Sequence, residues 1–390
     1  MKRIMAYNGF SNIMLELVVW MIYLKSFGWS MAEIAILEGS FTLFSALFEL
    51  PSGMIADKIG LKPSLQIGEA ICMLYLVSYF FPSQHMIVFI GFIAFALGLS
   101  LISGTDVSML YDSIEVQNKG KALKYIGYFN AIAILSVALG NLLGGFLAHY
   151  SWTFLFVMAF LLRLFALIII STVQIEDSIE DENVVPFENG HLALFFHFLR
   201  TNKSFKYLLV TSAVSTAAIT FSYQYGPIIF ESNGISTQGI SLVFGLISLL
   251  GAFFAFLPEK LTKFLSASQI VIFSLVLAIM CLIGMSIFRN EQVALVILLV
   301  IPNILYESWA VVLETSIQEV VLEKIRATLV SFVNLVNAAV LTVCSVIISL
   351  SSTSFSTLNI VSALSVFLLV IALMSYLLLG INNKKKEIKN

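Results

Sequence analysis

Twelve apolar runs, each about 20 residues long, fill almost all of this 390-residue chain. A helix needs about 20 mainly apolar residues to cross a bilayer, so each run is long enough to span a membrane. Hydrophobic residues make up 59% of the sequence, charged residues make up 11%, and the mean hydropathy is +0.98. A soluble domain carries roughly twice that share of charge. We therefore predict an all-α membrane protein.

The runs fall into two sets of six. They are expected at 6–26, 33–55, 64–82, 86–111, 123–148 and 152–173, and then at 207–230, 236–257, 266–288, 292–317, 327–350 and 357–380. Connectors within each set are short, as in packed helical hairpins. The predicted organisation is an N-terminal six-helix half at 1–173, a cytoplasmic central loop at 174–206, a C-terminal six-helix half at 207–381 and a basic tail at 382–390. The central loop begins with acidic residues and ends with apolar residues at helical spacing, which predicts a surface helix.

Lys and Arg are distributed unevenly over the connectors. With the N-terminus inside, eighteen of the 21 lie on the inner side, Lys25 and Arg289 lie outside, and Arg163 lies within a run. The positive-inside rule then places both termini in the cytoplasm. We expect a multi-pass protein of a bacterial plasma (inner) membrane, whose first run remains as an anchor because no cleavage site follows it.

Two segments at the ends of the fourth and tenth runs resemble each other. They read LYDSIEVQNKGKALKYIGYFN from Leu110 and LETSIQEVVLEKIRATLVSFVN from Leu313. In each segment the chain is expected to leave the membrane, form a charged turn and enter the membrane again. Duplicated halves are typical of secondary transporters, whose binding site lies at the midplane between the repeats.

The connector between the second and third runs gathers charge that the chain otherwise avoids. Its sequence GMIADKIGLK, residues 53–62, resembles the signature of the major facilitator superfamily, G-x-x-x-D-R/K-x-G-R-K, with Leu61 in place of a cation. Together with the twelve runs and the long central loop, the resemblance covers the whole chain. It implies the major facilitator fold, with twelve transmembrane helices in two six-helix halves.

That signature implies a conformational latch. Asp57 would accept hydrogen bonds from a helix N-terminus across the interface between the halves, where the helix dipole favours an anion. Glycines permit close helix approach and a tight turn, and the lysines are expected to pair with acids at the inner end of the fourth run. The latch residues are Gly53, Asp57, Lys58, Gly60, Lys62, Asp112 and Glu115. Their contacts would stabilise an outward-open state. The alternative is a solvated inner loop that carries only positive-inside charges.

The fifth run contains SVALGNLLGG, residues 136–145. This segment resembles the glycine-rich motif of the twelve-span drug:proton antiporters, with Gly140, Gly144 and Gly145 in place and Asn141 where that group has Pro. The alternative is plain packing of small residues between helices. Members of that group often carry an Arg in the fourth run for proton coupling. None is present here, so a coupled proton would use other residues.

Acidic side chains within apolar runs are costly and are therefore candidates for function. The resemblance implies that the first, fourth, seventh and tenth runs line a central cavity. The candidate substrate- and proton-binding residues on these runs are Glu16, Asp106, Tyr223, Gln224, Glu307 and Glu314. An acidic, aromatic-lined cavity suits a lipophilic cation.

Each of these acids also has a structural interpretation. Glu16 or Glu307 could pair with Arg163, the one cation within a run, and Asp106 could cap the backbone at Ser103–Thr105. Three further acids lie in the second and third runs. Glu38 could be an outer gate residue, whereas Glu49 and Glu69 are expected near the cytoplasmic interface, where they would snorkel or join the latch.

We predict that the protein is not an enzyme and uses no cofactor and no metal, because the sequence contains no phosphate-binding glycine loop and no nucleophile–base constellation. Cys72, Cys281 and Cys344 are expected to be buried small hydrophobes. The expected partners are a small-molecule substrate, protons and the lipid bilayer. Nucleic acid is not expected, because the basic tail is interpreted as a topology anchor. We expect a monomer.

The leading functional prediction is a secondary active transporter that works by alternating access. It would export lipophilic, cationic small molecules in exchange for protons, as multidrug efflux antiporters do. Competition of a cation and a proton for one carboxylate would produce the exchange. The alternatives are a proton-coupled importer of a small nutrient and a non-transporting membrane sensor or immunity protein. A state-dependent latch disfavours the last of these.

Overall fold

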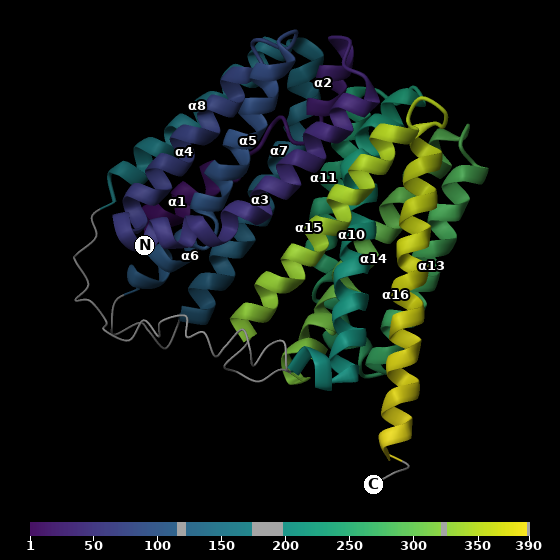
Figure 1. Ribbon diagram of the computed structural model, residues 1–390. Helices are drawn as coiled ribbons and strands as arrows, with labels where there is room; N and C mark the ends of the chain where they lie inside the picture. Colours follow the sequence, from purple (N-terminus) through teal and green to yellow (C-terminus); the bar gives the residue numbers. More distant parts are fainter. Residues whose placement is uncertain (115–121, 174–197, 321–325, 388–390) are drawn as a thin grey trace. The chain divides into compact units, whose positions relative to one another are not determined.

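The computed structural model describes residues 1–390 apart from 115–121, 174–197, 321–325 and 388–390 (Figure 1). All regular secondary structure in the described residues is helical. The chain divides into two compact units. Unit 1 comprises Met1–Asp181 and Ile235–Leu249, and unit 2 comprises Glu182–Gly234 and Leu250–Asn390. The predicted halves differ from these units in one helix, because the first part of the eighth span belongs to unit 1.

The helices of unit 1 are α1 (Lys2–Ser11), α2 (Trp20–Ser26), α3 (Met31–Ile59), α4 (Leu61–Ser78), α5 (His85–Ile102), α6 (Thr105–Asp112), α7 (Ala122–Tyr150), α8 (Trp152–Ser171) and the first part of α11 (Thr237–Phe254). Those of unit 2 are α10 (Lys203–Ser232), α12 (Leu257–Leu261), α13 (Ala267–Ile287), α14 (Gln292–Val320), α15 (Arg326–Ser351) and α16 (Thr357–Glu387). Each of the twelve predicted spans corresponds to one of these helices or to a pair of them.

Ten helices in the described part of the chain are long and apolar enough to cross a membrane. The two remaining spans are the first, which is divided between α1 and α2, and the third, which is α4. The predicted fold class is therefore confirmed: the protein is an all-α membrane protein with two six-helix halves. Most of the central loop, at 174–197, lies outside the described residues, and so does the first part of the predicted surface helix. The loop was predicted to end at residue 206, whereas α10 already begins at Lys203.

Two spans of unit 1 are discontinuous. The first is interrupted at Asn12–Val19, between α1 and α2, and the fourth is interrupted at Ser103 and Gly104, between α5 and α6. Gly104 has a φ of 78°, which a residue with a side chain rarely adopts. Figure 1 shows α6 at the end of unit 1 that carries the N-terminus, and α2 at the opposite end. The break in the first span was not predicted.

Short polar motifs define where several helices begin. Ser30 and Glu33 form a capping box at the start of α3, and Ser266 and Gln269 form one at the start of α13. Each box satisfies backbone N–H groups that the first helical turn leaves without a partner. These motifs explain why long apolar spans start abruptly at the ends of very short connectors.

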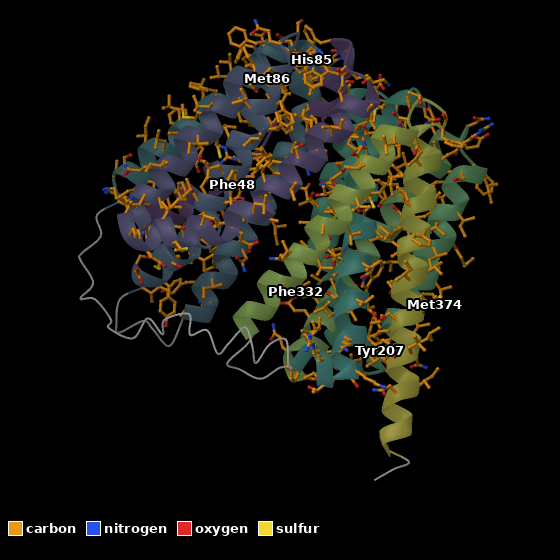
Figure 2. The ribbon with its side chains drawn as sticks, in the orientation of Figure 1. Phe48, His85, Met86, Tyr207, Phe332 and Met374 are labelled. Carbon is orange, nitrogen blue, oxygen red and sulfur yellow. The ribbon has the colours of Figure 1, made fainter. Side chains whose placement is uncertain are left out.

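The outer faces of the helices are apolar. Large hydrophobic side chains are exposed on spans of both units, among them Met86 at 71% and Met374 at 60% (Figure 2). A soluble protein rarely exposes apolar surface along its helices on this scale, whereas lipid chains cover such a surface without cost.

Candidate functional site

The break in the first span places an acidic residue inside unit 1. Glu16 lies in the interrupted segment, and only 3% of its surface is exposed. Its backbone oxygen accepts hydrogen bonds from the N–H groups of Val19, at 3.0 Å, and Trp20, at 2.9 Å, and so supports the start of α2. The side chain is thereby fixed at a position where the main chain is not helical.

The glycine motif of α7 packs against this break. A Cβ atom on Gly140 would come within 2.8 Å of the Met14 carbonyl oxygen, and one on Gly144 within 2.1 Å of the Leu15 oxygen. Neither position tolerates a side chain unless the backbone moves. The glycines therefore allow α7 to lie directly against the non-helical segment that holds Glu16.

The other two residues of the motif contact the first part of α11. The Gly145 N–H donates to the Ser241 hydroxyl at 2.5 Å, and the Asn141 side-chain amide donates to the Ser248 hydroxyl at 3.1 Å. Asn141 is 1% exposed. Its hydrogen bond is one that the Pro found in the antiporter motif could not make. The motif thus packs the broken span on one side and α11 on the other.

A buried ion pair lies beside the break. The Arg163 guanidinium of α8 donates through Nη1 to Glu69 Oε2 of α4 at 3.1 Å, and both side chains are at most 4% exposed. The same Nη1 donates to the Ser11 hydroxyl at 3.1 Å, and Ser11 donates to Glu69 Oε1 at 2.5 Å. Ser11 is the last residue of α1, so this triad connects the broken span to α4 and α8.

The triad differs from two expectations. Arg163 pairs with Glu69 rather than with Glu16, although Glu16 lies close enough to interact electrostatically with the guanidinium. Glu69 does not snorkel at the interface and is fully buried. The position of Glu69, eight residues after the start of α4, suggested a place too near the surface. Its neighbour Gly68 packs against the Gly98 backbone of α5, which draws this part of α4 into the interior.

Aromatic side chains of α2, α4 and α5 pack together in unit 1, close to Glu16. The hydroxyl groups of Tyr75 and Tyr79 lie 2.7 Å apart, and Tyr23 donates to the Tyr79 carbonyl at 2.7 Å. Tyr75 stacks on Phe95 with ring centroids 4.0 Å apart. Both Tyr75 and Tyr79 lie within electrostatic range of Glu16. These tyrosines were not identified from the sequence, where they look like ordinary apolar residues of the third span.

Asp106 occupies the first turn of α6, directly after the break at Gly104. Its Oδ1 accepts from the Val107 N–H at 2.7 Å, and its side chain is half-buried. This geometry matches the capping interpretation of Asp106. The carboxylate also interacts electrostatically with Tyr7 and with Glu69, so it belongs to the same acidic region.

Glu307 is the corresponding acid of unit 2. It lies near the middle of α14, half-buried, and a Cβ atom on Gly251 would come within 3.2 Å of its Cγ. Next to it, Tyr306 donates to the Thr216 hydroxyl at 3.1 Å and meets Trp309 edge to face, with centroids 5.6 Å apart. The absence of a side chain at Gly251 thus makes room for the carboxylate of Glu307, which interacts electrostatically with Tyr306.

The remaining candidates of unit 2 are less enclosed. Tyr223 and Gln224 are half-buried on α10, just before the buried Tyr225, Gly226 and Pro227. Glu314 is exposed and accepts from the Gln318 amide at 3.3 Å, one turn further along α14.

The predicted latch residues lie around the connection between α3 and α4. Gly60 alone joins the two helices, with a φ of 92°, so the tight turn depends on it. Asp57, Lys58 and Asp112 are exposed. Glu115 lies outside the described residues. Among the described residues, a Cβ built on Gly53 has no heavy atom of another element within 4 Å.

Lys62 has a different partner from the acids expected for it. Its Nζ donates to the Val173 carbonyl oxygen at 2.7 Å, just beyond the end of α8. Arg3 donates to the neighbouring Thr172 oxygen. Two cations therefore neutralise the negative end of the α8 dipole. In the structure, Lys62 fixes the end of α8 within unit 1 instead of binding Asp112.

An all-helical chain of two six-helix halves, with discontinuous spans and buried acids, has the properties of a secondary transporter. The chain belongs to the major facilitator superfamily, whose family model matches residues 4–341. It is thus a multi-pass membrane transporter, and transporters of this superfamily carry small molecules across a membrane.

Relatives and solved structures agree with this assignment. The chain is 26% identical to an uncharacterized MFS-type transporter of Methanocaldococcus jannaschii, over 65% of this chain and 66% of that protein, which is just under two thirds. It is also 26% identical to the quinolone resistance protein NorA of Staphylococcus aureus, over 72% of this chain and 71% of that protein. The crystal structure of the nucleoside transporter NupG superposes with a TM-score of 0.80 at 14% identity, covering 97% of this chain and 98% of that one. At that identity the likeness concerns the fold alone.

Proposed function

We propose that this protein exports lipophilic, cationic small molecules in exchange for protons. The observation that carries the proposal is the presence within the spans of two acids that interact electrostatically with tyrosines: Glu16 with Tyr75 and Tyr79, and Glu307 with Tyr306. A carboxylate attracts a cation, and aromatic faces add cation–π attraction while accepting apolar groups of many shapes. The similarity to a quinolone resistance protein supports the export direction.

Exchange follows from competition for the carboxylates. A carboxylate in an apolar span is costly while it is charged and unpaired, so it holds a proton until a cation replaces that proton. Binding of the substrate would release the proton, and proton binding from the other side would release the substrate. Glu307 and Glu16 are the leading candidates for this role, and Asp106, Glu314, Tyr223 and Gln224 would contribute to binding.

Alternating access would be controlled at the connection between α3 and α4. We propose that Asp57 makes a state-dependent contact with the opposite half, and that the turn at Gly60 presents it. The protein would operate as a monomer in a bacterial plasma membrane with both termini in the cytoplasm, as the excess of Lys and Arg on that side supports.

Inside-out membrane vesicles with an imposed proton gradient, acid inside, test this proposal. A panel of lipophilic cations is added while a pH-sensitive dye reports the gradient, for the wild type and for Glu307→Gln. Glu291→Gln is the matched control, because Glu291 is exposed just before the start of the same helix. We expect cations to dissipate the gradient in the wild type and in Glu291→Gln, but not in Glu307→Gln.

Two other results would contradict the proposal. Proton movement with neutral polar nutrients and not with cations would identify a proton-coupled importer. No proton movement with any compound would exclude proton exchange.

A further inference from the structure

The buried triad of Ser11, Glu69 and Arg163 and the nearby Glu16 contain one cation and two carboxylates. Arg163 is 3% exposed, Glu16 is 3% exposed and Glu69 is fully buried. A single guanidinium can neutralise only one of the two acids. The other acid must be protonated, because an unpaired charge in the interior of a membrane protein is very costly.

In the structure the Arg163 guanidinium forms its ion pair with Glu69. Arg163 Nη1 lies 3.1 Å from Glu69 Oε2, and the Ser11 hydroxyl donates to the other oxygen of that carboxylate. The ion pair with Arg163 stabilises the charged form of Glu69, so Glu69 is assigned as the ionised acid. Among the described residues, no side chain donates to the carboxylate of Glu16, so Glu16 is the protonated acid in this state.

Arg163 retains unused hydrogen-bonding capacity. Its Nη2 is buried, and no acceptor lies within hydrogen-bonding distance among the described residues. An Arg side chain has five N–H donors in a planar fork and can bind a second carboxylate without leaving its position. Glu16 lies within electrostatic range of this guanidinium, in the interrupted segment between α1 and α2.

We propose that Glu16 and Glu69 form a two-carboxylate proton site that shares the Arg163 guanidinium. In one state Glu69 is ionised and paired with Arg163 while Glu16 holds the proton. In the other state Glu16 is ionised and paired with Arg163 while Glu69 holds the proton. This inference rests on the proposed proton coupling and places the coupled proton within unit 1.

The two states contain the same number of protons and carry the same net charge. One proton leaves the carboxyl group of Glu16 and one binds to that of Glu69, so the summed charge of the three groups is zero both before and after. Ser11 suits both states, because a hydroxyl donates to an ionised Glu69 and accepts from a protonated one. Ser11 directly precedes the break, so a change in its hydrogen bonding acts on the segment that carries Glu16.

Other titratable side chains lie near Glu16 and Glu69 or next to their neighbours. They are Tyr7 of α1, Glu38 of α3, Cys72, Tyr75 and Tyr79 of α4, and Asp106 of α6. Asp106 and Tyr7 interact electrostatically with Glu69, whereas Tyr75 and Tyr79 interact with both Glu16 and Glu38. Each carboxylate of the pair therefore has its own neighbouring groups through which a proton can arrive or leave.

Infrared spectroscopy of the full-length protein, purified in detergent at neutral pH, tests the proposal. The carbonyl stretch of a protonated carboxyl group distinguishes it from a carboxylate. We expect Glu16→Gln to lose one such band relative to the wild type. Glu69→Gln should lose the same band, because Arg163 then pairs with Glu16 and ionises it. Glu69→Gln/Arg163→Gln should keep the band, because no guanidinium remains.

A fourth variant keeps the test decisive if Glu69→Gln fails to fold. Arg163→Gln leaves both acids without a cation and should gain one protonated carboxyl band, which disappears in Glu69→Gln/Arg163→Gln. Persistence of the Glu16 band in Glu69→Gln, no band loss in Glu16→Gln, or no gain in Arg163→Gln would each overturn the shared site. The spectra report protonation without transport, so they separate failure of this inference from failure of the proposed exchange.

Discussion

Gly144 of α7 lies so close to the first span that a Cβ atom on it would come within 2.1 Å of the Leu15 carbonyl oxygen. This contact explains why a glycine occupies a helix that has no need of a turn there. It also connects two features that appear unrelated in the sequence, the glycine motif of the fifth span and an acid in the first.

Gly144→Ala is expected to destabilise the protein, because the added methyl group forces α7 away from the break. Overpacking of this kind typically costs about 1–3 kcal/mol. Gly127→Ala in the same helix is the matched control, since a Cβ built there has no heavy atom of the described residues of other elements within 4 Å. Thermal unfolding in detergent should show a lower midpoint for Gly144→Ala and an equal or higher one for Gly127→Ala. Equal midpoints for Gly144→Ala and the wild type would contradict the close contact.

Arg163→Gln should destabilise the protein at neutral pH, because Glu69 loses its cation and must take up a proton to remain buried. Removal of one partner of a buried pair costs about 3–5 kcal/mol. The loss should shrink at acid pH, where protonation of Glu69 costs less free energy. Unfolding midpoints measured across a pH series provide the check. Glu69→Gln/Arg163→Gln serves as the charge-neutral comparison and should lose less, and a loss independent of pH would argue against the ion pair.

Gly60→Ala should weaken the connection between α3 and α4. Gly60 has a φ of 92° and a ψ of 156°, a conformation almost restricted to glycine, and a side chain there costs about 1–3 kcal/mol. Gly53→Ala, seven residues earlier, adds a methyl group that has no heavy atom of another described element within 4 Å, so stability should stay unchanged or rise slightly. The two variants are compared by thermal unfolding. A loss of stability in Gly53→Ala equal to that in Gly60→Ala would show that another feature of the segment is responsible.

Asp57→Asn should abolish transport while leaving membrane insertion intact, if the proposed latch operates. The substitution keeps the size of the side chain and removes the charge that a helix N-terminus would bind. The measurements are substrate-driven proton movement in vesicles and the amount of protein in the membrane fraction. Full activity in Asp57→Asn would refute the latch, whereas loss of the protein from the membrane would indicate a role in insertion instead.

The positions of the spans were predictable from the sequence because their cause is local. An apolar run of about 20 residues is sufficient for a transmembrane helix, and the observed helices follow the predicted runs closely. The break at Asn12–Val19 could not be predicted in this way. Its central residues, Ile-Met-Leu-Glu-Leu-Val-Val, contain neither Gly nor Pro, and the glycines that pack against it lie more than 120 residues later.

The triad of Ser11, Glu69 and Arg163 could not be predicted from the sequence for a related reason. Distance along the chain gives the depth of a residue only approximately, and Glu69 is close to the start of its helix. Its partner Arg163 is 94 residues away, so only the packing of α4 against α8 shows that the two meet. By contrast, the capping of Asp106 was recognisable, because its cause, a break at Gly104, lies two residues away.

The dependence of the first span on α7 has a consequence for how the protein is made. The first span emerges from the ribosome long before the fifth, and lipid offers no hydrogen bonds to an interrupted helix. We therefore expect the break at Asn12–Val19 to become stable only once Gly140 and Gly144 pack against it. The segment that is synthesised first would then be among the last of unit 1 to reach its final conformation.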